Sequence, residues 1–252
     1  MPTITHLYRY PIKGMSPEAL QLVSLQAGKM IPLDRCFALA HGTTEFDPNA
    51  PQHLKKTNFV MQMKNERLAT LHTVYDHSTS TLLIYRDDKP VVTGNLQEIE
   101  GRQKIEQFFA DYLGDEIRGE PKLVQAPEHN FSDVDMKVLS CINLASVRDF
   151  EKRIDTKIHH LRFRANVYFD EASPFVESDW IDKELKLGSA IVRGVRLIKR
   201  CAATNVNPET ATRDMELPQT LIDTYGHPNL GIYVRVIEDG EVALNNHFEL
   251  IS

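Results

Sequence analysis

The chain has 252 residues, of which 42% are hydrophobic and 25% charged, close to the average for soluble globular proteins. This composition excludes disordered, collagen-like and membrane-spanning classes, and the length suits one large all-β domain or two smaller domains. The formal net charge of -6 argues against nucleic-acid binding, which needs a surplus of lysine and arginine on one face.

The N-terminus and the cysteines indicate the compartment. The first residues lack the charged and apolar regions of a signal peptide, and no stretch approaches the roughly 18 apolar residues of a membrane span. Cys36, Cys141 and Cys201 are odd in number and far apart, which argues against a disulfide framework. No CxxC pattern occurs, so a zinc ribbon is not expected either. We therefore expect a cytoplasmic protein without a membrane anchor.

Short strand-like runs dominate the first part of the chain. They cover residues 3–10, 20–25, 36–40, 68–75 and 82–86. Turn formers such as Lys13-Gly14 and Asp47-Pro48 separate them. This alternation predicts a barrel or a sandwich.

Residues 96–113 predict a helix. Apolar side chains repeat there at helical spacing, at Ile105, Phe108, Phe109, Tyr112 and Leu113. Asn95 followed by Glu98 resembles a capping pair, and Gly114 suits the left-handed position after the last turn.

The remainder predicts a second half. Residues 119–130 contain Pro121 and Pro127 and predict a connection, which divides the chain into residues 1–120 and 121–252. Helices are expected at 144–154 and 219–225, and strands at 166–169, 190–198 and 231–237. The fold class is therefore mainly β with a few helices (α+β).

Cys201 lies between an expected strand and a polar turn, where a thiol is accessible. The neighbouring cations Lys199 and Arg200 favour the thiolate, the form that acts as a nucleophile or binds a soft metal. Spacing alone fits a half-buried structural cysteine better.

Arg162 and Arg164 lie two residues apart in a segment expected to be extended, so their side chains should point to the same side. Arginine pairs of this kind bind phosphate with paired hydrogen bonds, although a solvated strand face is the commoner explanation. His159 and His160 are adjacent, should face opposite sides of a strand, and are not expected to share a metal.

Taken in order, these segments resemble the MOSC domain, the module found at the C-terminus of molybdenum cofactor sulfurases and in mitochondrial amidoxime-reducing proteins. The family pattern has an RFRxN strand, an F-x-E-D/S-x-W loop, an apolar strand and an R/K-C-x-x-T-x-V-x-P-x-T segment, and it matches residues 162–210. Residues 10–14 and 32–35 resemble the β-barrel domain that precedes MOSC. The resemblance implies an N-terminal β-barrel domain followed by a β-barrel MOSC domain.

The resemblance also implies a cofactor site. Cys201 would be the catalytic residue and the protein ligand of molybdenum. The residues implied to bind the pterin and phosphate are Lys13, Arg35, Lys56, Thr57, Asn58, Arg162, Arg164, Asn166 and Thr204. The chain departs from the pattern at Gly14, where the family often has serine, at residues 54–58, which replace T-x-R-Q, and at Ala165 and Asn245-Asn246.

The activity implied by the resemblance is two-electron reduction of a small N-hydroxylated compound, with electrons from a separate ferredoxin- or cytochrome-type protein. A second hypothesis is a carrier without redox turnover, in which Cys201 accepts sulfur as a persulfide or the protein delivers the molybdenum cofactor. A third is a β-rich protein whose cofactor site has decayed, which Gly14 and the altered residues 54–58 encourage.

Overall fold

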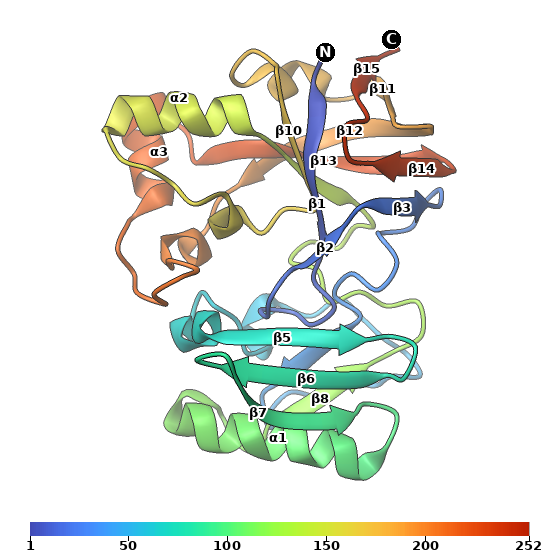
Figure 1. Cartoon of the computed structure of the whole chain (residues 1–252), viewed down its shortest axis with the longest axis vertical. Helices are drawn as coiled ribbons and strands as arrows, with labels where there is room; N and C mark the ends of the chain where they lie inside the picture. The colour runs from blue at the N-terminus through green and yellow to red at the C-terminus, as the bar shows by residue number, and fades with distance from the viewer. Residues whose placement is uncertain (252) are drawn as a thin grey trace.

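The computed structural model describes residues 1–251, which consist mostly of strands with three α-helices (Figure 1). The expectation of a mainly β fold with a few helices is confirmed. No helix among these residues has both the length and the apolar character needed to cross a membrane.

The largest sheet has eight strands and is built from both ends of the chain. Its order is β15 (Phe248–Leu250), β11 (Glu184–Leu187), β12 (Ala190–Lys199), β13 (Asn229–Glu238), β9 (Leu139–Asn143), β10 (Val167–Asp170), β1 (Thr3–Arg9) and β2 (Glu18–Leu20). Backbone hydrogen bonds from Ile4 N to Asn246 O (2.8 Å) and from Phe248 N to Pro2 O (2.9 Å) join β1 to the segment around β15. The sheet is therefore curled into a half-barrel, with β1 beside the segment that leads into β15.

Strands β9 and β10 are parallel, and the other neighbours in this sheet are antiparallel. A parallel pair needs a crossover, which α2 (Leu144–Ile154) provides. Asn143 caps this helix by accepting a hydrogen bond from Ala145 N (3.0 Å). The predicted bounds of this helix are confirmed. Helix α3 (Leu217–Tyr225) begins two residues before its predicted start.

The other sheets are small. Strands β5 (Leu71–Asp76), β6 (Thr81–Arg86) and β7 (Lys89–Asn95) form one, β4 (Phe37–Ala40) pairs with β8 (Lys122–Gln125), and β3 (Leu22–Leu25) pairs with β14 (Gly240–Ala243). Helix α1 (Ile99–Leu113) packs against β7. A Cβ at Gly101 would lie 2.1 Å from Asn95 O, so only glycine allows this close approach.

Among residues 1–251, six short 3₁₀ helices connect these elements. They are η1 (Lys56–Asn58), η2 (Glu66–Thr70), η3 (Gly114–Glu116), η4 (His160–Phe163), η5 (Val176–Trp180) and η6 (Ala202–Asn205).

Strand pairing crosses the boundary expected at residue 120 in both directions. Strands β1 and β2 belong to the large sheet, whereas β8, which follows the boundary, pairs with β4. Residues 119–130, expected as a plain connection, therefore contain a strand. The division into residues 1–120 and 121–252 stays a prediction.

A group of three packed imidazoles lies where β1 meets η4. The His160 ring centroid is 4.7 Å from that of His6 and 5.0 Å from that of His159, and Tyr8 Oη lies 3.2 Å from His160 Nε2. The expectation that His159 and His160 face opposite sides is therefore wrong, because the segment turns into a 3₁₀ helix. Burial, followed by the charges of His6 and His159, lowers the pKa of His160 to about 4.

We expect the protein to lose stability as the pH falls from 6.5 toward 4. The pKa of folded His160 lies below its ordinary value of 6.5, so the unfolded state binds more protons within this window. Thermal unfolding across this pH range measures the effect. His160→Gln should flatten the dependence, whereas His77→Gln, on an exposed turn, should not. An unchanged slope in the His160 variant would contradict the assignment.

Candidate functional site

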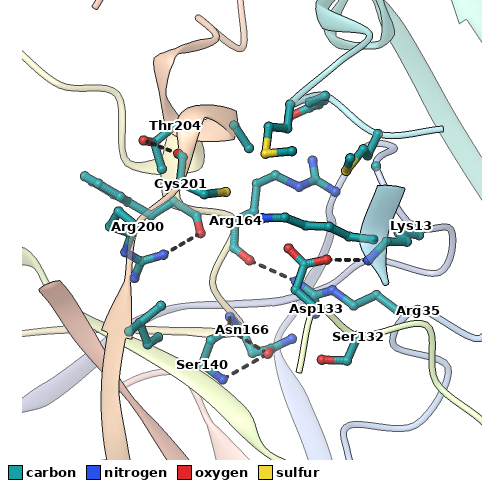
Figure 2. A pocket seen from close by; sticks show the side chains of 18 of the residues that line it. Lys13, Arg35, Ser132, Asp133, Ser140, Arg164, Asn166, Arg200, Cys201 and Thr204 are labelled. Carbon is teal, nitrogen blue, oxygen red and sulfur yellow. Dashed lines mark hydrogen bonds and ion pairs between the residues drawn. The ribbon is translucent and has the colours of Figure 1, made fainter. Parts of the chain in front are cut away.

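A pocket lies where residues of the two halves of the chain meet, and Figure 2 shows its lining. It encloses about 940 Å³ of empty space, including the part open to solvent. The first half contributes side chains between Lys13 and Met63, and the second half contributes side chains between Ser132 and Tyr233. Both halves are therefore needed to form the pocket.

Strand β12 delivers Cys201 to this pocket. The chain leaves the sheet after Lys199, and Cys201 becomes the residue that precedes η6. Its carbonyl oxygen accepts hydrogen bonds from Thr204 N (3.0 Å) and Thr204 Oγ1 (2.9 Å), which fix the turn. The half-buried thiol is directed into the pocket (Figure 2).

The other two cysteines do not line the pocket. Cys141 is fully buried in β9, and burial raises the pKa of its thiol. Burial likewise raises the pKa of Cys36 to about 12. Of the three cysteines, Cys201 is the one placed to meet a ligand.

The guanidinium of Arg200, expected to favour the Cys201 thiolate, is instead bonded to backbone carbonyls. Arg200 is buried and donates to Leu230 O through Nε (2.8 Å) and to Phe163 O through Nη1 (3.2 Å). Lys56, from the other half of the chain, lies beside the Cys201 thiol. Burial lowers the pKa of Lys56, but the charges of Cys201 and Asp133 and a hydrogen bond with the Cys201 side chain outweigh burial and raise it.

The prediction that Arg162 and Arg164 extend to the same side is wrong. Arg162 lies within η4, and Arg164, the residue after this helix, has a left-handed backbone with φ 50°. Arg162 forms two hydrogen bonds to Asp214 (2.6 and 2.8 Å) and donates to Asn205 O (3.1 Å). Arg164 instead donates to Met15 O (2.7 Å) and stacks over the Tyr10 ring at 4.4 Å. Both arginines still line the pocket, but different neighbours hold their side chains.

Lys13 and Arg35 line the same pocket as predicted. Lys13 is 4% exposed, donates to Phe131 O (2.9 Å) and forms an ion pair with Asp133. Arg35 pairs with the buried Asp34 and donates to Arg164 O (3.0 Å). Burial lowers the pKa of Lys13, although Asp133 offsets part of this effect.

Of the remaining predicted cofactor-binding residues, some line the pocket and others do not. Asn166 and Thr204 line the pocket, but their polar atoms are bonded within the protein: Asn166 Oδ1 accepts from Ser140 Oγ (2.9 Å) and Asn166 Nδ2 donates to Tyr8 O (3.2 Å). Thr57 and Asn58 lie outside the lining, although Lys56 beside them is part of it.

Gly14 has a structural reason to depart from serine. Its φ of +81° is strained for any other residue, and an added Cβ would lie 3.2 Å from Val60 O. This departure therefore gives no support to a decayed site.

Sequence reasoning missed Asp133, Tyr233 and the segment Met61, Gln62 and Met63, all of which line the pocket. Asp133 and the methionines lie in loops without periodicity. Tyr233 lies within the strand expected at residues 231–237, in the sequence Gly231-Ile232-Tyr233, which resembles a G-x-Y element of the MOSC pattern and was a usable signal. Burial raises the pKa of Tyr233, so its hydroxyl stays protonated at neutral pH.

The charge balance of the pocket fits an anionic ligand. Asp133 is the one carboxylate among its lining residues, which include the cations Lys13, Lys56, Arg164 and Arg200. Within residues 1–251, Arg164 has no carboxylate partner, and the buried Nε of Arg162 has no hydrogen-bond partner. Together with one thiol, these donors suit a molybdenum cofactor, which carries both a phosphate and a metal that binds thiolate.

Both halves of the chain match models of known protein families. Residues 127–249 match the MOSC domain, and residues 1–121 match the MOSC N-terminal beta barrel domain. The human mitochondrial amidoxime-reducing component 1 is 22% identical over 88% of this chain and 72% of its own length. Mitochondrial amidoxime reducing component 2 of Macaca fascicularis is 27% identical over 59% of this chain, which spans about half of that relative (52%).

The molybdenum cofactor sulfurase of Drosophila willistoni is 30% identical over 62% of this chain but only 20% of its own length. Among solved structures, the YUAD protein from Bacillus subtilis covers 99% of this chain, and the chain covers 96% of it, with 11% identity and a TM-score of 0.45. The matches to both family models together span nearly the whole chain. The chain belongs to the MOSC domain family and carries the family's N-terminal β-barrel domain before its MOSC domain.

Proposed function

We propose that the protein binds the molybdenum cofactor in this pocket and reduces small N-hydroxylated compounds with electrons from a separate redox protein. The observation that carries the proposal is the pocket between the two halves, which combines one accessible thiol with a surplus of cations. The amidoxime-reducing relatives give the reaction its class. In this reaction an N–O bond breaks, the oxygen leaves as water, and two electrons and two protons are consumed.

Each residue has a defined task in this proposal. Cys201 would bind the metal, and Arg164 and Lys13 would hold the phosphate with charged hydrogen bonds. Lys56 lines the same pocket as Cys201 and Asp133, and its charge would balance that of the thiolate. When bound, the cofactor supplies the two-electron redox chemistry, and the protein supplies orientation and electrostatics.

The proposal is tested by metal analysis of the protein purified from a host that makes the cofactor. We expect close to one molybdenum per chain. A metal-free protein from such a host would contradict the proposal and would favour a decayed site.

A carrier function is the alternative. Its support is the presence of Lys56 in the same pocket as the Cys201 thiol, because a nearby cation also suits a thiolate nucleophile that accepts sulfur. In this case the Cys201 thiolate would take the outer sulfur of a donor persulfide and release the donor as a thiol, or the protein would deliver the cofactor without turnover. The three free cysteines suit the reducing cytoplasm, which is the location we propose.

We expect Arg164→Ala to reduce cofactor retention about tenfold or more, because a lost charged hydrogen bond costs roughly 1.5 to 3 kcal/mol. The measurement is molybdenum content after dialysis. Arg162→Ala should also lower cofactor retention. This variant should in addition unfold at a lower temperature, because Arg162 holds Asp214 and the loop after Cys201. Arg148→Ala, which loses an exposed ion pair with Asp170, is the control. Wild-type retention in the Arg164 variant would contradict a phosphate contact.

A further inference from the structure

The segment Met61, Gln62 and Met63 forms one wall of the pocket, here called the methionine wall. It follows Val60, which donates to Leu39 O (2.8 Å), and it ends in a turn closed by Asn65 N donating to Met61 O (2.9 Å). Asn65 Oδ1 also accepts from Met61 N (3.1 Å). The wall therefore has a fixed local shape, but its backbone belongs to the half of the chain that does not carry Cys201.

One side chain joins this wall to the loop of Cys201. Arg213 donates through Nη2 to Met63 O (2.9 Å), to Glu66 Oε2 (2.9 Å) and more weakly to Gln62 O (3.4 Å). Through Nη1 it donates to Ala202 O (3.3 Å), the carbonyl next to Cys201. A single planar guanidinium therefore sets the spacing between the wall and the residue after the thiol.

Arg213 is itself held by the second half of the chain. Val206 and Arg213 form an antiparallel bridge, and Asn207 N donates to Thr212 O (2.8 Å) to close the turn between them. The next residue, Asp214, accepts two hydrogen bonds from Arg162. The position of the guanidinium is thus fixed on the same loop that presents Cys201.

The wall differs in character from the rest of the pocket. Its two thioether side chains, with Met30 and Phe163 elsewhere in the lining, are apolar, whereas the side around Lys13 and Arg164 is cationic. Methionine is flexible and polarizable, and it adapts to apolar groups of different shapes.

We propose that Arg213 is a positioning residue that holds the methionine wall against Cys201, and that this wall selects substrates with an apolar body. The substrate selection rests on the proposed function. The holding of the methionine wall by Arg213, here called the clamp, does not. Without Arg213 the wall is free to move away from Ala202, so access to the thiol widens and the apolar contact is lost.

The clamp is tested on the full-length, cofactor-free protein by the rate at which N-ethylmaleimide alkylates Cys201, followed by mass spectrometry of its peptide. Arg213→Ala should raise this rate about tenfold, which corresponds to the loss of one charged hydrogen bond. The alkylation rate of the Arg213→Lys variant should lie between those of the wild type and Arg213→Ala, because lysine keeps the charge but loses the several N–H donors of the guanidinium. Glu66→Gln keeps the backbone bonds and should give a smaller rise. Alkylation of Cys36 is the internal reference.

An unchanged alkylation rate at Cys201 in the Arg213→Ala and Glu66→Gln variants would overturn the clamp. A faster rate at both Cys201 and Cys36 would also overturn it, because it would show general loosening of the fold.

Selection is tested on the molybdenum-loaded protein. Arg213→Ala should raise KM for aromatic amidoximes while KM for hydroxylamine, kcat and metal content stay unchanged. Equal KM values for wild type and variant would overturn the selection. If the loaded protein shows no reduction at all, the proposed function and the selection fail together, while the alkylation rates still decide the clamp.

Discussion

Replacing Cys201 with alanine is expected to abolish bound molybdenum while the fold survives. The thiol is the one sulfur ligand that a cysteine offers to the pocket, since Cys36 and Cys141 lie outside its lining. The side chain is half-buried at the end of β12, and the hydrogen bonds that fix the turn use the Cys201 carbonyl, which alanine retains. Metal content and thermal unfolding, measured on the same preparation, separate the two effects.

The other cysteines provide matched controls. Cys36→Ala should keep both metal and stability. Cys141→Ala should keep the metal but lose about 1 to 2 kcal/mol of stability, because its side chain is fully buried in β9 and leaves a cavity. Metal at the wild-type level in the Cys201 variant would remove this residue from the site.

The sequence predicted those helices and strands whose own residues show periodic apolar spacing or a capping residue. Helix α2 has apolar side chains at helical spacing and a capping asparagine, and its predicted bounds agree with the structure. Strand β9 was missed because all five of its residues are buried, so it shows no alternation. Helix α1 begins at Ile99 rather than at residue 96, because Asn95 first forms a turn by accepting from Gln97 N (2.9 Å).

The site was predictable only where residues follow a motif. Cys201, Lys13 and Arg35 stand in recognisable segments, and all three line the pocket. The extended geometry of Arg162 and Arg164 was wrong because the left-handed backbone of Arg164 leaves no mark in the sequence, where glycine or asparagine would have signalled it. Asp133 and Met63 reach the pocket through contacts between distant segments, which no local pattern encodes.

The loaded protein is expected to reduce an N-hydroxylated substrate with a chemical reductant and to show no turnover with NADH alone. The sequence contains no GxGxxG nucleotide-binding motif, and its three cysteines are far apart. Within the described part of the chain, no group of three or more His, Cys, Asp or Glu residues is arranged to hold a metal ion, as a built-in iron–sulfur relay would require. In the proposed function, electrons would reach the pocket from a ferredoxin- or cytochrome-type partner.

The assay compares benzamidoxime reduction with reduced methyl viologen, with NADH, and with NADH plus a ferredoxin and its reductase. The Cys201→Ala protein is the control for reduction that does not depend on the site. Turnover with the viologen but not with NADH would support a molybdenum enzyme served by a separate electron carrier. Turnover with NADH alone would refute the need for a partner. A protein that retains molybdenum yet reduces nothing in any arm would contradict the reductase and favour the carrier, because the same thiol would then hold the cofactor without transferring electrons.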